Sequence, residues 1–204
     1  MQLVLATNNQ DKIKEIKYLL EDLPVTVLSK NDYMEFPEVE ETGETLEENA
    51  LLKAKVIAEF CDLPALADDS GLEVDALGGA PGVFSSRYAG ENATYESNCK
   101  KLLKELKGGP PDKRTARFRC VIAIDWHDGR TQTTEGVAEG LITEDLQGGQ
   151  GFGYDPVFYF PLKNRRFSEM STEEKNVVSH RGIALQNMVG LMMERLNTFN
   201  QGRR

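Results

Sequence analysis

Hydrophobic residues along this chain recur at two spacings, which predict an alternation of strands and helices. Short apolar runs at residues 2–6, 25–28, 63–67 and 157–160 predict strands that are largely buried. The longest alternating run, from Ala116 to Trp126, predicts a further strand. Asp128 and Gly129 form a hairpin signal after it, and the return strand is expected to reach about Ile142.

Apolar residues three and four apart predict four helices. The first begins after Asn9 and exposes Lys14, Glu15, Lys17 and Glu21 on its polar side. The second runs from a Thr45–Glu48 capping box to about Phe60, and the third runs from Thr94 to Leu106. The last carries its apolar stripe from Leu185 to Leu196. Strands and helices in alternation indicate an α/β protein.

Composition narrows the class of protein. The chain has 204 residues, of which 40% are hydrophobic, and no repeat is visible, so we expect one globular domain. A formal net charge of −9 argues against a general nucleic-acid binder, because that affinity depends on a basic surface. The sequence shows neither a signal peptide nor a run long enough to span a membrane. Cys61, Cys99 and Cys120 have no metal-ligand spacing and are expected to be reduced core residues of a cytoplasmic protein.

Two adjacent acids mark the most informative stretch, ADDSGLEVDALGGAPGVFSSRYAG at residues 67–90. The apolar run before them predicts a strand that ends at Asp68 and Asp69, with the glycine-rich bend at residues 78–82 further on. Neighbouring strand residues point to opposite faces, so at most one of the two acids faces a given cleft directly. The pattern is typical of the metal-facing edge of a nucleotide site, and the alternative is an acidic surface turn.

The first strand, a small polar loop and a helix start follow one another at Thr7, Asn8, Asn9 and Lys12. A helix start leaves backbone N–H groups free to bind an anion, and Lys12 could reach a phosphate from the first turn. The alternative is an ordinary cap by Asn8 or Asn9 beside a solvated lysine.

Two regions near the end of the chain suggest recognition of a base. Phe152 lies between glycines in GGQGFGY, where it could stack on a base or plug into the core. Donors then gather before the final helix, where they suit carbonyl or phosphate groups, or where Ser179 simply caps the helix among exposed basic neighbours. These donors are Lys175, Asn176, Ser179, His180 and Arg181.

Taken together, these pieces resemble the Ham1-like non-canonical purine nucleoside triphosphate pyrophosphatases, the inosine/xanthosine triphosphate diphosphatases. The matching segments are ATNNQDKIKEI, EETGETLEENALLKA, ADDSGLEVDALGGAPGVFSSRYAG, ARFRC, GGQGFGYDPVF and EEKNVVSHRGIA. Many members have Gly where this chain has Asn8. The resemblance implies a single domain over residues 1–204, with a long twisted mixed sheet, flanking helices, two lobes and a central cleft, commonly as a homodimer.

The same resemblance implies the reaction and its residues. A nucleoside triphosphate such as ITP, dITP or XTP would be hydrolysed to the monophosphate and pyrophosphate with a divalent cation, usually Mg²⁺. Glu41, Asp68 and Asp69 would hold the metal and the water, with Asp69 as the proton acceptor. The triphosphate would contact Thr7, Asn8, Asn9 and Lys12, and the nucleotide would contact Ser70, Phe152, Gly153, Tyr154, Asp155, Lys175, His180 and Arg181. We also count Lys53 among the substrate-binding candidates, and Lys12 and Glu41 among the catalytic ones.

Two other functions are compatible with the residues. One is a related pyrophosphatase that acts on modified pyrimidine triphosphates. The other is a nucleotide-binding module without catalysis, although clustered acids beside phosphates have little use in a protein that only binds polyanions.

Overall fold

The strands form a mixed sheet, which confirms the predicted α/β class. The computed structural model describes residues 1–201, with side chains through residue 197 apart from Pro111. In this range one seven-stranded sheet has the order β2-β1-β3-β4-β5-β6-β7. β1 is parallel to β2 and β3, whereas β6 is antiparallel to β5 and β7. The bounds are β1 Gln2–Leu5, β2 Thr26–Leu28, β3 Ala65–Val74, β4 Thr115–Asp125, β5 Thr131–Ile142, β6 Phe158–Phe160 and β7 Arg165–Arg166.

The helices begin where local capping signals lie. Asn9, Thr45 and Thr94 are N-caps, each accepting backbone N–H groups of the following turn, as expected for such residues. A short helix before the last one was not predicted, although Ser171 and Glu174 form its capping box. The bounds are α1 Gln10–Leu19, α2 Leu46–Cys61, α3 Tyr95–Glu105, α4 Thr172–Val178 and α5 His180–Gln201.

Strand β3 differs from the prediction at its far end. We expected the strand to end at Asp68 and Asp69, but it continues to Val74, so both acids lie within it. Buried carboxylates do not interrupt the strand because cationic side chains accompany them: Lys12 contacts Asp68, and Lys53 contacts Asp69. The glycine-rich bend follows Val74 as predicted, with Gly78, Gly79 and Gly82 all at positive φ.

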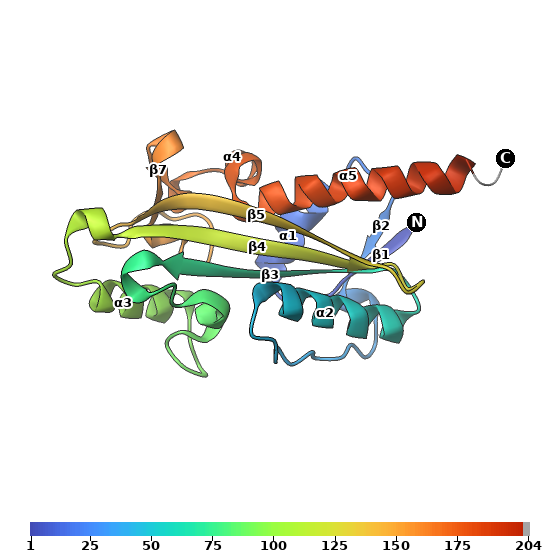
Figure 1. Cartoon of the computed structure of the whole chain (residues 1–204), viewed down its shortest axis with the longest axis horizontal. Helices are drawn as coiled ribbons and strands as arrows, with labels where there is room; N and C mark the ends of the chain where they lie inside the picture. The colour runs from blue at the N-terminus through green and yellow to red at the C-terminus, as the bar shows by residue number, and fades with distance from the viewer. Residues whose placement is uncertain (202–204) are drawn as a thin grey trace. The chain divides into compact units, whose positions relative to one another are not determined.

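The chain divides into two compact units. The first contains Met1–Asp69, Val121–Gly136 and the chain from Arg181 onward, and the second contains Ser70–Cys120 and Val137–His180. Within the first unit, α2 and α5 lie on opposite sides of the strands (Figure 1). The buried residues there come from β1, α1, α2 and α5, among them Leu5, Ile16, Ile57 and Met188.

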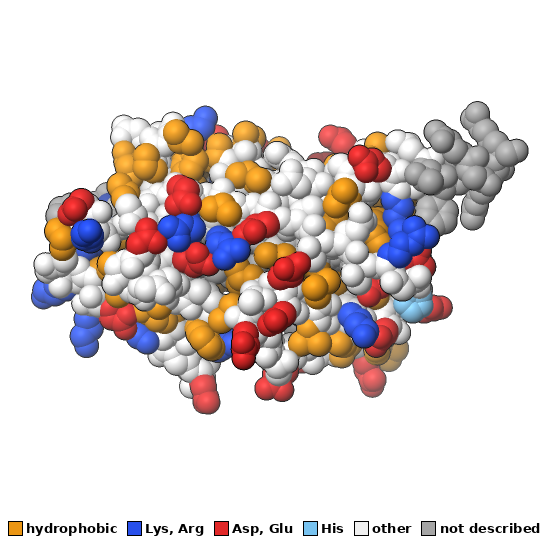
Figure 2. All heavy atoms as spheres, in the orientation of Figure 1, with side chains coloured by type: hydrophobic (Ala, Val, Ile, Leu, Met, Phe, Trp, Pro, Cys, Tyr) orange, Lys and Arg blue, Asp and Glu red, His pale blue; other side chains and the backbone are white. Residues whose placement is uncertain are grey.

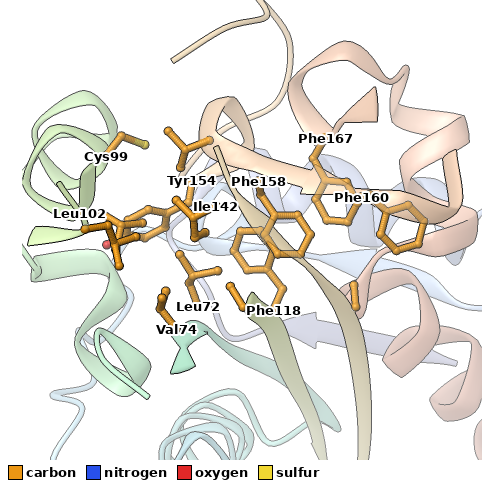
Figure 3. Close-up of a cluster of buried hydrophobic side chains, with 14 of the residues drawn as sticks. Leu72, Val74, Cys99, Leu102, Phe118, Ile142, Tyr154, Phe158, Phe160 and Phe167 are labelled. Carbon is orange, nitrogen blue, oxygen red and sulfur yellow. The ribbon is translucent and has the colours of Figure 1, made fainter. Parts of the chain in front are cut away.

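The second unit has a core rich in aromatic side chains. Phe118 of β4 packs against Phe158 of β6 and Phe167, with ring centroids 4.6 and 5.8 Å apart. Figure 3 shows these rings together with Leu72 and Val74 of β3 and Ile142 of β5. Phe118 belongs to the strand predicted from Ala116 to Trp126, and it is buried in this core. The same core holds Cys99 and Tyr154.

The surface carries charges of both signs. On the face shown in Figure 2, Lys and Arg side chains lie among Asp and Glu side chains. On β3, β4 and β5 such an arrangement joins Arg117 to Glu73, Asp75 and Glu139. None of the helices within residues 1–201 has the length and hydrophobicity needed to cross a membrane. Within the same residues no disulfide is formed; Cys99 and Cys120 are buried, as expected, whereas Cys61 is only partly buried.

Candidate functional site

A lysine joins two acids in the first unit. Lys53 lies on the inner face of α2, and its Nζ is 2.7 Å from Oε1 of Glu41 and 2.9 Å from Oδ1 of Asp69. Its side chain is 10% exposed, so the ammonium group is held by these carboxylates rather than by bulk water. Glu41, from the acidic loop before α2, is thereby brought beside the acid of β3. In the sequence, Glu41 and Asp69 lie 12 and 16 positions from Lys53.

The neighbouring acid, Asp68, has different partners. Its Oδ2 atom lies 2.9 Å from Nζ of Lys12 and 3.2 Å from Nη2 of Arg181. Alternation along β3 accounts for the separate cations, since adjacent strand residues point to opposite faces. Arg181 also pairs with Glu15 of α1, at 2.5 Å between Nη1 and Oε2.

Burial and neighbouring charges shift the pKa values of Asp68 and Asp69 in opposite directions. Burial alone would raise the pKa of Asp68, but the charges of Lys12, Arg181 and Lys53 outweigh it and hold that pKa well below its usual range. The pKa of Asp69 is raised, chiefly by burial and further by the Glu41 charge, against the opposing effect of Lys53. The pKa of Lys53 is raised because Asp69, Asp68 and Glu41 together outweigh its desolvation.

Two carboxylate oxygens remain without partners. Oδ1 of Asp68 and Oδ2 of Asp69 are buried and have no hydrogen-bond partner among the described residues. Buried polar atoms are nearly always paired, so such oxygens suit a cation or a water. The described side chains include no group of three or more His, Cys, Asp or Glu already arranged to hold a metal ion. The two buried oxygens without partners fit a hard divalent cation that takes its other ligands from water or substrate.

The loop before α1 has the geometry of a capped helix. Oδ1 of Asn9 accepts the N–H groups of Asp11 and Lys12 at 2.9 and 3.2 Å, and Oγ1 of Thr7 accepts the N–H of Asn9. Asn8 is exposed. The capping alternative thus holds for Asn9, whereas Lys12 is not simply solvated, because its ammonium contacts Asp68.

A second cluster lies in the second unit, around Asp155. Its Oδ2 atom accepts the Phe152 N–H at 2.9 Å and the ammonium of Lys175 at 2.7 Å. The Asp155 and Lys175 side chains are only 3% and 4% exposed. The Lys175 ammonium also lies 4.7 Å from the centre of the Phe152 ring, a cation–π contact. One carboxylate therefore fixes both the glycine-rich loop and the lysine of α4.

The aromatic residue of that loop is only partly buried. Phe152 packs against Tyr95 at 5.9 Å between ring centroids, and Tyr95 is 45% exposed. The ring therefore does not plug into the main core, which was one of its two predicted roles. Tyr95 falls among the apolar residues of the helix predicted from Thr94 to Leu106, yet it lies at the edge of this cluster. Its position at the exposed first turn of the helix explains the difference.

The basic residues at the start of α5 are buried, which makes the alternative of exposed basic neighbours around Ser179 wrong. His180 stacks on Phe118 with ring centroids 4.6 Å apart, and Arg181 is 1% exposed. Asn176, beside Lys175, is 2% exposed, and its Nδ2 atom has no hydrogen-bond partner among the described residues. Paired acids and aromatic rings keep this polar segment inside.

The predicted residues thus fall into two sets. The first unit brings together Lys12, Glu41, Lys53, Asp68, Asp69 and Arg181. The second unit holds Phe152, Asp155 and Lys175 in one cluster, with Gly153 and Tyr154 in the same loop and Ser70 and His180 elsewhere in that unit.

Sequence reasoning missed Glu15, which was expected in solvent but is 6% exposed. Its spacing of three from Lys12 places both residues on one helix face, and this was the available signal.

Comparisons with known proteins agree along nearly the whole chain. The model of the Ham1 family matches residues 3–191. The dITP/XTP pyrophosphatase of Desulforamulus reducens is 53% identical over 192 residues, which are 94% of this chain and 96% of the relative. The dITP/XTP pyrophosphatase of Bacillus subtilis is 45% identical over 93% of this chain and 96% of the relative's length. The structure of a HAM1 protein from Coxiella burnetii is 44% identical in sequence and has a TM-score of 0.87. The match covers 95% of this chain and 99% of that protein.

Proposed function

Because the chain belongs to the Ham1 family, we propose that it hydrolyses dITP, ITP and XTP to the monophosphate and pyrophosphate. The relatives from Desulforamulus reducens and Bacillus subtilis are both dITP/XTP pyrophosphatases. The observation that carries the proposal is the cluster in which Lys53 joins Glu41 to Asp69 beside Asp68. Acids with unpaired oxygens, next to lysines and a helix N-terminus, suit a cation and a triphosphate.

In this proposal the first unit binds the triphosphate. Thr7 and Asn8 donate hydrogen bonds to phosphate oxygens, the N-terminus of α1 adds its dipole, and Lys12 adds a positive charge. Glu41, Asp68 and Asp69 would hold Mg²⁺, which would supply charge neutralisation and make a water more acidic.

Asp69 accepts the proton of the water that attacks the α-phosphorus. Its raised pKa suits a proton acceptor, while Asp68 stays ionised beside Lys12 and Arg181. Lys53 orients the carboxylates of Glu41 and Asp69 through its two contacts. The bond between the α- and β-phosphates breaks, and pyrophosphate leaves.

The second unit supplies recognition of the base. Phe152 offers an aromatic face, and Lys175 and His180 offer donors for the 6-oxo group of hypoxanthine or xanthine. Asn176 adds an amide donor whose Nδ2 has no partner among the described residues. Adenine presents an amino group at the same position, which would leave these donors unpaired.

A nucleotide panel tests the function. With Mg²⁺, we expect pyrophosphate release from dITP, ITP and XTP at kcat/KM values at least tenfold above those for ATP and GTP. Faster release from a modified pyrimidine triphosphate would instead favour the related pyrophosphatase. Tight binding of ITP without release would favour a binding module.

A variant of the proton acceptor tests the mechanism. Asp69→Asn should fold and lose at least about 100-fold in kcat, the usual scale of general-base catalysis. Asp62→Asn is the matched control, because Asp62 is exposed and lies at positive φ, which Asn tolerates. Full activity in Asp69→Asn would remove this residue from the mechanism.

We also propose a homodimer and a cytoplasmic location. Phe84 of the Gly82–Arg87 turn is 57% exposed, which supports an interface there. Cysteines that form no disulfide within the described residues support a reducing compartment. Light scattering after size-exclusion chromatography tests the dimer, and Phe84→Ser should shift it toward the monomer.

A further inference from the structure

We propose that Ser85 is a positioning residue for substrate binding, because it ties the strand after Ser70 to the loop that carries Phe152. This inference rests on the proposed function and adds to it a residue outside both clusters. Ser85 lies in the turn Gly82–Arg87 and is 7% exposed. Its hydroxyl and its carbonyl contact different parts of the second unit.

The hydroxyl fixes strand β3. Oγ of Ser85 accepts the backbone N–H of Leu72 at 2.9 Å and donates to the carbonyl of Gly82 at 2.6 Å. The backbones also approach closely here, since a Cβ on Gly71 would lie 2.4 Å from that same carbonyl oxygen. Only glycine fits at residue 71, and the chain segment that follows Ser70 is held against the turn.

The carbonyl fixes the glycine-rich loop. The Tyr154 hydroxyl donates to the carbonyl of Ser85 at 2.8 Å, and Tyr154 is 4% exposed. Figure 3 shows its ring within the core, near Leu102 and Cys99. Tyr154 therefore directs its hydroxyl to the turn. Its role in this proposal is to hold Phe152 and Asp155, the residues on either side of Gly153 and itself, rather than to read the base.

Helix α3 supports both contacts. Asn98, 3% exposed, donates from Nδ2 to the carbonyls of Ser85 and Ser86 at 3.3 and 3.1 Å and accepts the N–H of Ala89 at 2.7 Å. The next residue, Cys99, contacts the carbonyl of Gly153 with Sγ at 3.4 Å. Adjacent residues of α3 thus hold both the Gly82–Arg87 turn and the glycine-rich loop.

Ser85, Tyr154 and Asn98 form what we call the frame of the turn and the loop, and their loss should affect substrate binding in a distinct way. They touch no reacting atom, so their loss should displace Ser70 and Phe152 and weaken nucleotide binding more than turnover. Ser85→Ala removes the hydroxyl and leaves the carbonyl, whereas Tyr154→Phe removes the donor to that carbonyl. Ser86→Ala and Tyr159→Phe are matched controls, because Ser86 is exposed and Tyr159 bonds to Asn164 on the surface.

The experiment measures KM, kcat and melting temperature for the four variants with ITP and Mg²⁺. We expect Ser85→Ala and Tyr154→Phe each to raise KM about tenfold with kcat within about threefold, and the controls to match wild type. A fifth variant combines Ser85→Ala with Tyr154→Phe. Its rise in KM should be smaller than the product of the two single rises, because both changes act through one turn. A lowered melting temperature with unchanged KM, or effects that multiply, would overturn the proposal.

Hydrogen exchange separates this proposal from the function on which it rests. Exchange of amides in residues 148–155 should quicken in both frame variants, while α5 keeps wild-type protection. This measurement needs no substrate. Inactivity of the wild-type protein with faster loop exchange would refute the function alone, and unchanged loop exchange would refute the frame.

Discussion

Glu15 of α1 and Arg181 of α5 form a buried ion pair, with Nη1 2.5 Å from Oε2 and side chains that are 7% and 2% exposed, respectively. Arg181 shares its guanidinium with Asp68, so one arginine links the first helix, the last helix and β3. Removing one partner of such a pair leaves a buried charge poorly compensated.

We therefore expect Glu15→Gln to destabilise the protein by about 3 kcal/mol, the lower end for a broken buried pair, because Asp68 still faces Arg181. Chemical denaturation monitored by circular dichroism measures this free energy. Glu21→Gln, an exposed residue just beyond α1, should change it by less than about 0.5 kcal/mol. Equal stability of the two variants would contradict the importance of the pair.

The glycine-rich loop offers a second prediction. A Cβ on Gly151 would lie 2.1 Å from Oδ2 of Asp155, and the residue has φ +78°. Gly151→Ala should displace the carboxylate that holds Phe152 and Lys175, and lower kcat/KM for ITP at least tenfold. Gly149→Ala is the control within the same loop, because its Cβ meets nothing within 4 Å. A rate loss common to both variants would argue against a specific role for Asp155.

Asn176 gives a prediction about base choice. Its unpaired Nδ2 donor favours a carbonyl on the base, and a lost hydrogen bond of this kind is worth about 1 to 3 kcal/mol. Asn176→Ala should lower the ratio of kcat/KM for ITP to that for ATP about tenfold. Asn187→Ala, at an exposed position of α5, should leave the ratio unchanged. An unchanged ratio in Asn176→Ala, with a lower melting temperature, would assign the residue to packing.

Cys61 and Cys99 should differ in their reactivity toward an alkylating reagent. Burial, with the charges of Asp155 and Glu96, raises the pKa of Cys99 to about 12. The reactive thiolate of Cys99 is therefore scarce at every pH below that value. With iodoacetamide at pH 8 we expect mass spectrometry to find Cys61 modified first, since it is partly exposed. Early modification of Cys99 in the folded protein would contradict its burial.

Much of the fold was predictable because its signals are local. The capping residues Thr45 and Thr94 set the starts of their helices, and the alternation from Ala116 onward marked β4. Helix α4 was missed although Ser171 and Glu174 carried the same capping signal, since only seven residues follow it. Short elements give the hydrophobic period too little length to be recognised.

Long-range pairing explains the remaining differences. Glu15 looked solvated because Arg181, its partner, lies 166 residues away. Strand β3 was expected to stop at its acids because nothing nearby in sequence revealed Lys12 and Lys53 as their cations. The residue types of the candidate site were visible in the sequence, whereas their pairings were not.

The side-by-side acids of β3 have a consequence for any change in chain length. Since successive strand residues face opposite ways, deleting a single residue upstream within the strand would carry each carboxylate to the other's side. Asp69 would then take the position that faces Lys12 and Arg181, Ser70 would face Lys53, and both orphan oxygens would leave their present surroundings. Residues 65–67 are fully buried, so the packing of the strand upstream of the acids holds this register.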